Sequence, residues 1–168
     1  RAQSALLVGK LYPLLLLLRP AEMAKLRLSN INLAKQTILV QDTISKNRKD
    51  GTITLPTKVI HLMLDLKIFD YPNDYYLFSN EMKPGKDEKS EKMFRDWWTR
   101  HVRKDLKLSD KYKFYSLKDT GITNMLRHND VLSVRDQARH SSILMTDIYT
   151  PHDIQEANSL IKNYQGDF

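Results

Sequence analysis

Two residues near the C-terminal end, His140 and Tyr149, have side chains that could act on a phosphate group. If one unbroken helix carried both, nine steps of about 100° each would place them on opposite faces. They can share a site only if the helix breaks between them, and Ser141 and Ser142 offer that break. A tyrosine placed in this way in a strongly basic chain suggests a nucleophile for DNA phosphodiesters.

The composition favours a polyanionic partner. The chain has 168 residues, enough for one domain with its own core, and its 27 Lys and Arg against 20 Asp and Glu give a formal net charge of +7. This excess would make DNA binding depend on salt, although a basic protein without a nucleic-acid partner could have the same charge. The absence of cysteine excludes a disulfide scaffold and a thiol nucleophile, and the scattered histidines predict no metal site.

The only apolar run that invites a membrane interpretation is Leu14 to Leu18. Lys10, Arg19 and Glu22 interrupt its surroundings, so the stretch is far shorter than the roughly 20 residues that a span needs. We therefore expect a buried helix and no membrane partner. Because the chain begins at Arg1 rather than at a methionine, we expect it to be part of a longer protein.

The elements that must position these side chains are expected to be mostly helical. β-branched residues at 37–40 and 52–55 predict two strands, and the charged turn between them ends in Asp50-Gly51, a strong hairpin signal. A short apolar piece at 75–78 is compatible with a further buried strand. Helices are predicted at 2–18, 20–28, about 56–66 and 93–106, and capping patterns predict further helix starts at Ser116, Ser133 and Thr150. The fold class is thus mainly α with one small antiparallel sheet (α+β).

Three further segments contain charged or phenolic side chains that could also act at a phosphate group. Arg19 and Glu22 stand three residues apart, on one face of a helix. The charged hairpin offers Lys46 and Lys49. Finally, Tyr115 and Lys118 flank a helix start, where anions bind well.

In this order and spacing, the chain resembles the catalytic domain of tyrosine recombinases, the phage integrase family. The family pattern is Arg-x-x-Glu/Asp, a hairpin Lys, His-x-x-Arg, and then Leu-Gly-His with a nucleophilic Tyr nine residues after that His. Three pieces of this chain, Arg-Pro-x-Glu, Ser-Lys-Asn and Tyr-Ser-x-Lys-Asp-Thr-Gly, more narrowly resemble integrases of Bacteroidetes mobile elements. The resemblance covers the chain from Arg19 to beyond Tyr149.

The resemblance implies a role for each matching residue. Tyr149 would attack the scissile phosphate and form a 3′-phosphotyrosyl link, while Lys46 would protonate the departing 5′-oxygen. Glu22 would orient the neighbouring cations, and no metal ion, cofactor or ATP would be needed, because the covalent intermediate keeps the phosphate bond energy. The extra negative charge of the transition state would be stabilised by the remaining cationic residues, Arg19, Lys118 and His140.

Three positions depart from the family pattern. Tyr115 stands where the family has His, and it can still donate a hydrogen bond. Lys118 stands where the family has its second Arg, and lysine lacks the planar bidentate grip of a guanidinium on two phosphate oxygens. Arg139 replaces the Gly before the His and adds a cation that could compensate. The choice between Lys46 and Lys49 as the proton donor stays open, because Lys49 is closer to Pro56, as in shorter family hairpins.

A wider set of basic residues is predicted to contact the DNA backbone, with solvent-exposed charge as the alternative. Trp97 and Trp98, which lie among several of them, are assigned to the core rather than to base stacking. The candidate DNA contacts are Arg48, Lys58, Arg95, Arg100, Arg103, Lys104 and Arg135.

The resemblance also has implications for the whole protein. Residues 1–168 would be a single catalytic domain, and a separate N-terminal DNA-clamping domain would be absent from this chain. The partners would be double-stranded DNA and three further copies, in a homo-tetramer on two duplexes, within the bacterial cytoplasm at the nucleoid. The segment after Tyr149, with Ile154, Leu160 and Ile161 on one face, would dock on a neighbouring copy or pack within its own chain. The alternatives are a DNA-binding module without cleavage and a relaxing topoisomerase.

Overall fold

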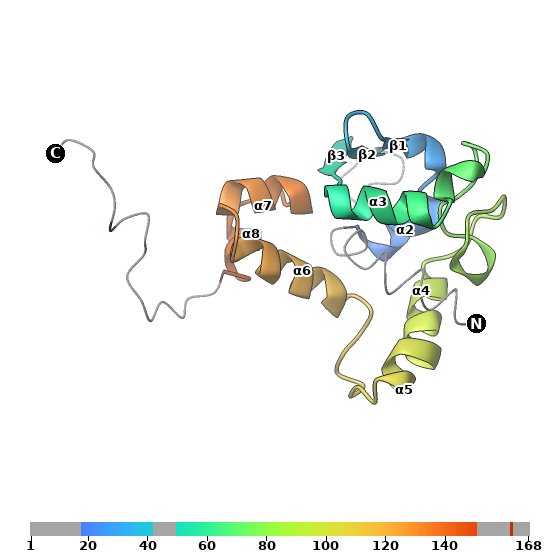
Figure 1. Cartoon of the computed structure of the whole chain (residues 1–168). Helices are drawn as coiled ribbons and strands as arrows, with labels where there is room; N and C mark the ends of the chain where they lie inside the picture. Colours follow the sequence, from blue (N-terminus) through green and yellow to red (C-terminus); the bar gives the residue numbers. More distant parts are fainter. Residues whose placement is uncertain (1–17, 42–49, 151–161, 163–168) are drawn as a thin grey trace.

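The structure is a computed structural model that describes residues 18–41, 50–150 and 162. The predicted helix at 2–18 lies outside the described residues except for Leu18, which is buried. The principal elements are α2 (Pro20–Lys25), β1 (Ile31–Asn32), β2 (Thr37–Val40), β3 (Gly51–Thr54), α3 (Thr57–Asp65), α4 (Lys92–Trp97), α5 (Arg103–Asp105), α6 (Ser116–Leu126), α7 (Val131–Ala138) and α8 (Leu144–Asp147). They confirm a mainly α fold with one small antiparallel sheet (Figure 1).

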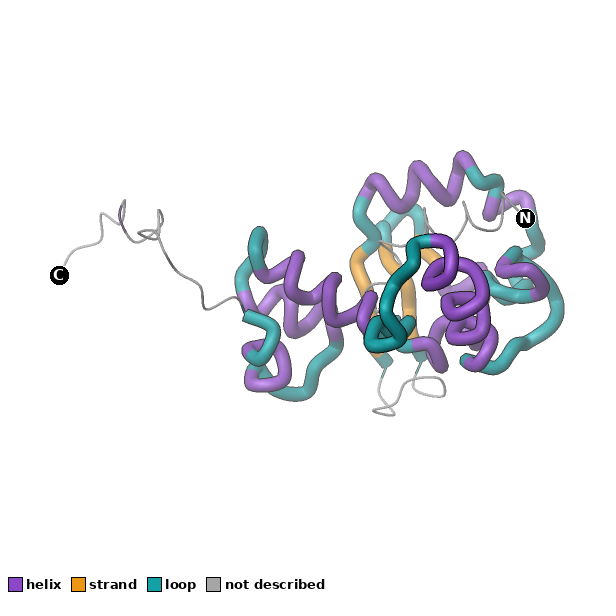
Figure 2. Tube along the Cα trace, turned by 90° about the horizontal axis from the view of Figure 1, so that it is seen from below, coloured by secondary structure: helices purple, strands orange, loops and turns teal. Residues whose placement is uncertain are grey.

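The sheet has the order β1-β2-β3, and both pairs of strands are antiparallel. Ile38 is paired with Ile53, and both are buried, whereas Leu39 on the opposite face of β2 is 40% exposed. This alternation follows from the two-residue period of a strand and fixes which face meets the core. Figure 2 shows the strands side by side among the helices. The predicted strand at 37–40 is confirmed, and the second strand begins one residue earlier than predicted.

Helix α3 covers the core with Val59, Ile60 and Met63, which lie on one helical face. The predicted helix at 93–106 is confirmed as the continuous path of α4, a π-helical turn at Trp98–Val102 and α5. Trp98 is 7% exposed, and its indole N–H donates to the carbonyl of Tyr112 at 2.8 Å. Its assignment to the core is therefore confirmed.

One helix end and one possible strand differ from the sequence-based expectation. The helix predicted at 20–28 ends at Lys25, and Leu26 is extended, because the carbonyl of Leu26 accepts a hydrogen bond from Leu77. The piece at 75–78 is buried from Tyr76 onward, but it pairs only through isolated bridges and forms no regular strand. In both cases a long-range backbone contact replaces the local structure that the sequence favours.

The predicted capping residues also need correction. Helix α7 begins at Val131 and is capped by the carboxylate of Asp130, which accepts from the backbone N–H of Ser133 at 2.9 Å. Ser133 is thus the third residue of the helix rather than its cap. Helix α6 starts at Ser116 itself, with Tyr115 in the capping position and no side-chain cap. The prediction at Thr150 concerns a helix that lies outside the described residues.

Helix α7 packs against α6, α8 and β3 (Figure 1). The link between α7 and the sheet is the side-chain amide of Gln137. It accepts from the backbone N–H of Thr54 at 3.0 Å and donates to the carbonyl of the same residue at 2.7 Å. These two bonds tie the C-terminal end of α7 to the end of β3. None of the helices in the described ranges has the length and apolar character that a membrane span requires.

Candidate active site

The buried carboxylate of Glu22 organises the N-terminal part of the site. Its Oε2 accepts the backbone N–H of Arg19 at 2.8 Å, and its Oε1 forms an ion pair with Nη1 of Arg19 at 2.9 Å. Glu22 therefore closes the first turn of α2, which Pro20 opens at a position that tolerates proline. Since Glu22 is only 1% exposed, its charge depends on the guanidinium groups beside it.

Arg139 is the second cation on Glu22. Its Nη2 contacts Oε2 of Glu22, across 117 positions of the chain, and its side chain is 10% exposed. The backbone of Arg139 is left-handed, with φ at 54° and ψ at 44°, because this residue terminates α7. Glycine favours that conformation, and a side chain there costs about 1–2 kcal/mol. The ion pair with Glu22 offsets this cost.

Lys118 lies on the first turn of α6 and is 3% exposed. Its ammonium donates to the carbonyl of Ala138 at 3.4 Å. Burial and the nearby charge of Arg19, opposed by Glu22, lower the pKa of Lys118 to about 8. A phosphate brought beside it would favour the charged form again.

The lowered pKa of Lys118 predicts an alkaline limit on the DNA cleavage that the sequence resemblance implies. Below about pH 8 the side chain is charged, and above it the cation is lost, so cleavage at subsaturating DNA should fall about tenfold for each further pH unit. The Lys118→Arg variant should lack this limit, because a guanidinium stays protonated. Initial cleavage rates between pH 7 and about 9.5 measure both profiles. The same alkaline limit in both proteins would assign it to another group.

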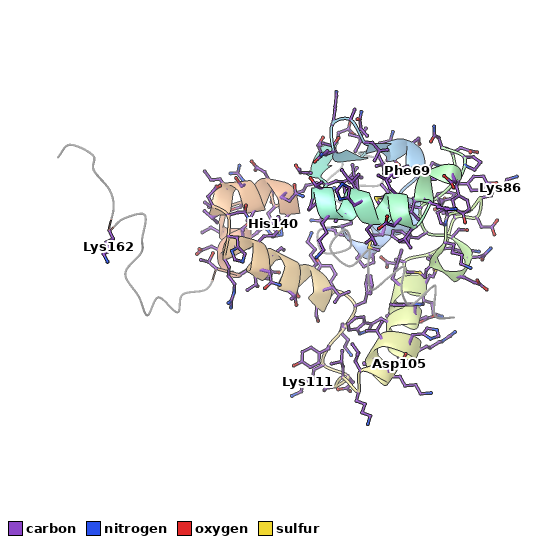
Figure 3. The ribbon with its side chains drawn as sticks, viewed as in Figure 1. Phe69, Lys86, Asp105, Lys111, His140 and Lys162 are labelled. Atoms are coloured by element: carbon purple, nitrogen blue, oxygen red, sulfur yellow. The ribbon has the colours of Figure 1, made fainter. Side chains whose placement is uncertain are left out.

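His140 and Tyr149 meet because the helix breaks between them. Helix α7 ends at Ala138 and α8 begins at Leu144, so the chain turns back at Ser141 and Ser142. The two rings stack with centroids 6.2 Å apart and planes 26° apart. Figure 3 labels His140 on the side of the molecule formed by α6, α7 and α8. The break predicted from the sequence is confirmed.

The protonation of His140 is set by its surroundings. Nδ1 lies 2.9 Å from the hydroxyl of Thr146, which is fully buried on α8. Burial, and then the charges of Lys118 and Arg19, lower the pKa of His140. The imidazole is therefore neutral at pH 7 in the absence of a bound anion.

The hydroxyl of Tyr149 donates a hydrogen bond to Oδ1 of Asp119 at 3.1 Å. Burial, and then this carboxylate, raise the pKa of Tyr149 to about 12, and Tyr115 acts in the same direction. The phenol is thus held in its protonated form. Its attack on a phosphorus atom would require the hydrogen bond to Asp119 to open and the proton to leave.

A family model described as "Phage integrase family" matches residues 12–156. The chain belongs to the phage integrase family. The predicted resemblance is therefore confirmed. No curated protein matches the chain.

Solved structures of phage integrase relatives share the fold. The chain resembles XerA recombinase, with 19% identity and a TM-score of 0.65, over 99% of this chain and 58% of that one. It also resembles the XerH site-specific recombinase bound to palindromic difH substrate, with 22% identity and a TM-score of 0.67, over 92% of this chain and 43% of that one. The chain also resembles the Tn1549 transposon integrase in complex with transposon right end DNA. The identity is 15% and the TM-score 0.67, over 90% of this chain and 58% of that one. The chain spans less than two thirds of each of these proteins.

The structure brings six of the predicted site residues of this integrase-family chain into one cluster through direct contacts or electrostatic proximity. They are Arg19, Glu22, Lys118, Arg139, His140 and Tyr149. Tyr115, 46% exposed, stands at its edge. The hairpin candidates Lys46, Arg48 and Lys49 lie outside the described residues. Among those described, no group of three metal-ligating side chains occurs.

The predicted DNA contacts fall into two groups. Arg95 and Arg103 line a cavity of about 290 Å³ beside Tyr115, together with Lys92 and Lys113. The others do not line it: Arg100 pairs with Asp96 at 3.9 Å, Arg135 with Asp136 at 2.6 Å, and Lys58 and Lys104 are exposed.

Sequence reasoning missed three residues that shape the site, namely Asp119, Thr146 and Gln137. Asp119 lies beside Lys118 within the Tyr-Ser-x-Lys-Asp-Thr-Gly piece, which was the only signal for it. Thr146 and Gln137 carry no signal in the sequence, because each acts through a partner that only the packing of α7 and α8 supplies.

Proposed function

We propose that this chain is the catalytic domain of a site-specific tyrosine recombinase that integrates or excises a mobile DNA element. The observation that carries the proposal is the convergence of Arg19, Lys118 and Arg139 beside His140 and Tyr149. A concentration of positive charge around a tyrosine suits a reaction in which a phosphodiester gains negative charge. Family membership supports the same chemistry.

In the proposed reaction, Oη of Tyr149 forms a bond to the scissile phosphorus and the bond to the 5′-oxygen breaks. The phenol proton passes to solvent or to Asp119, its hydrogen-bond acceptor in the structure. The departing 5′-oxygen takes a proton from the hairpin lysine, Lys46 or Lys49. Attack of another 5′-hydroxyl on the phosphotyrosine reverses these steps and joins a new strand, so the number of phosphodiester bonds is conserved.

The neutral His140 would act as a hydrogen-bond donor to a phosphate oxygen rather than as a base. Its Nδ1 is already engaged by Thr146, which leaves Nε2 for the ligand. Tyr115, at the edge of the site, would donate from its phenol to the same phosphate, in place of the family His. Glu22 would hold the two arginines in place.

DNA would extend from this cluster over the basic cavity. Arg95, Arg103, Lys92 and Lys113 surround that cavity beside Tyr115, and their charges suit a phosphate of the neighbouring backbone. Solved relatives support DNA as the partner: the Tn1549 integrase is in complex with transposon right end DNA, and XerH is bound to its difH substrate. Lys58, Arg48, Arg100, Lys104 and Arg135 remain weaker candidates for backbone contacts.

The proposal also includes a further domain and further copies of the protein. Residues 1–168 would act with an N-terminal DNA-clamping domain of a longer protein, as four copies on two duplexes at the bacterial nucleoid. The fact that this chain spans 58% of XerA and 43% of XerH supports a further domain.

The test is covalent trapping on a nicked suicide substrate made from the ends of the element that encodes the protein. The longer protein should be tested beside this chain, because a domain without its clamp is expected to bind DNA weakly. We expect an SDS-resistant adduct whose tryptic phosphopeptide carries the DNA on Tyr149. Site-specific binding without an adduct would favour the DNA-binding module, and relaxation of supercoils at any sequence would favour the topoisomerase.

A further inference from the structure

We propose that Arg139 is a catalytic residue that supplies the second guanidinium to the scissile phosphate, the part that Lys118 cannot play. This inference rests on the proposed function and names an additional ligand of its phosphate. The sequence indicates Arg139 as the source of this guanidinium, because Lys118 stands where the family has Arg and Arg139 stands where the family has Gly. The structure provides the evidence that these two changes belong together.

Within the described part of the chain, two buried donor atoms of Arg139 have no acceptor. Only its Nη2 has an acceptor, the carboxylate of Glu22, whereas Nε and Nη1 are buried and have no hydrogen-bond partner among the described residues. The side chain is nine-tenths buried, so water does not readily replace the missing acceptors. An unsatisfied buried donor costs about 1–3 kcal/mol, and more when it is charged. Two such donors on one guanidinium indicate a site that an anion completes.

The position of Arg139 fits that anion. The two oxygens of Glu22 divide between the two guanidinium groups, Oε1 accepting from Arg19 and Oε2 from Arg139. Arg19 and Arg139 both lie close enough to Lys118 to lower its pKa. A phosphate that reaches Lys118 would therefore lie close to both guanidinium groups. His140, the next residue in the chain, lies in the same electrostatic environment.

Two backbone features accommodate the arginine. Position 139 is left-handed, a conformation that Lys67 and Lys107 also adopt in this structure, so the backbone tolerates an arginine there. Across from it, a Cβ on Gly51 would lie 2.6 Å from Cδ of Arg139, so Gly51 leaves the space through which the side chain passes. If Arg139 acted only as a structural clamp, joining α7 to α2 through Glu22, it would need Nη2 alone. The unused Nε and Nη1 distinguish a phosphate ligand from such a clamp.

In the reaction, Arg139 would neither give nor take a proton. Either Nε or Nη1, paired with the second hydrogen of Nη2, would bind two non-bridging oxygens of the phosphate, and the bonds would strengthen as negative charge grows on them. A lysine presents a single ammonium without this planar fork. Lys118 and Arg139 would thus share the charge and the geometry that one arginine provides elsewhere in the family.

The first test compares single-turnover cleavage of the suicide substrate by the wild-type protein and by the Arg139→Gly variant. Glycine adopts the left-handed conformation without strain, so the variant should fold, which its Tm will show. We expect the cleavage rate to fall about 10²- to 10³-fold. The Kd for DNA should rise less than about tenfold, because several other cations also bind the backbone. The matched control is Lys67→Gly, which removes one exposed cation at another left-handed position, φ 53°, and should cleave normally.

The second test is rescue by a guanidinium at the neighbouring position. Adding Lys118→Arg to Arg139→Gly should recover at least about tenfold of the cleavage rate, whereas a clamp role would not be rescued in this way. In addition, Gly51→Ala should slow cleavage in the wild-type background and have little effect in the Arg139→Gly background, since its clash is with Arg139. This non-additivity would tie the effect to the arginine side chain.

The outcomes separate this inference from the proposed function. An adduct with the wild-type protein and near-normal cleavage by Arg139→Gly would overturn the role of Arg139 alone. A slow Arg139→Gly variant that Lys118→Arg does not rescue would also overturn it, in favour of a clamp. If the wild-type longer protein bound its site and formed no adduct, the proposed function would fail and the catalytic role of Arg139 with it.

Discussion

The Tyr149→Phe variant should form no covalent adduct with DNA, and its cleavage rate should fall by on the order of 10⁶-fold. The change removes only the hydroxyl oxygen, and the ring can still stack on His140, so the site should keep its shape. The hydrogen bond to Asp119 is lost, which should cost about 1 kcal/mol of stability. DNA affinity should stay within about twofold, because no cation is removed.

The measurement is the yield of SDS-resistant adduct on the suicide substrate, with binding followed separately by gel shift. Tyr112→Phe is the matched control, because Tyr112 is 55% exposed and its contact with Trp98 uses the backbone carbonyl. That variant should form the adduct at the wild-type rate. An adduct that persisted in Tyr149→Phe would assign the nucleophile to another side chain and would remove the central element of the proposed mechanism.

The Glu22→Gln variant should lower the free energy of unfolding by about 3–5 kcal/mol, the cost of leaving buried charge without its partner. Glu22 is 1% exposed and carries two guanidinium groups whose side chains are 14% and 10% exposed. Glutamine keeps the shape and can still accept the backbone N–H of Arg19, so the start of α2 should survive. What is lost is the negative charge among Arg19, Arg139 and Lys118.

Urea unfolding of this chain measures the difference. The control is Glu81→Gln, whose ion pair with Lys83 involves a side chain that is 73% exposed, and it should change stability by less than about 1 kcal/mol. Adding Arg139→Gly to Glu22→Gln should recover part of the loss, because one of the unpaired cations is then removed. A loss below about 1 kcal/mol for Glu22→Gln would show that solvent reaches the Glu22 carboxylate and screens the pair.

The Tyr149→Phe and Glu22→Gln variants report on different properties of one cluster. Tyr149→Phe should remove chemistry and leave the fold, whereas Glu22→Gln should weaken the fold through the groups that bind the phosphate. Glu22 joins α2 to the end of α7 through Arg139, and Tyr149, just after α8, joins that segment to α6 through Asp119. This dependence explains why no single segment of the chain forms the site.

The sequence by itself determined the local features of this protein. The β-branched pattern and Asp50-Gly51 indicated the hairpin strands, and Ser141 and Ser142 indicated the break that lets His140 meet Tyr149. The spacing of Arg19 and Glu22 indicated that they meet, although Arg19 is the extended N-cap of α2 and does not share a helical face with Glu22. These predictions succeeded because helix and strand periods relate neighbouring residues by fixed angles. The order of the motifs was also sufficient to indicate the family.

Only the tertiary structure decided how the charges of the site are shared. The contact between Glu22 and Arg139, the hydrogen bond from Tyr149 to Asp119, and the burial that lowers the pKa of Lys118 all join residues that spacing does not relate. The failure at Ser133 is of the same kind on a small scale, because Asp130 competed for the same helix start. Local periods fix which face a side chain occupies. The depth of its burial and the identity of its partner depend on how α2, α6 and α7 pack together, and burial then shifts the pKa of Lys118, His140 and Tyr149.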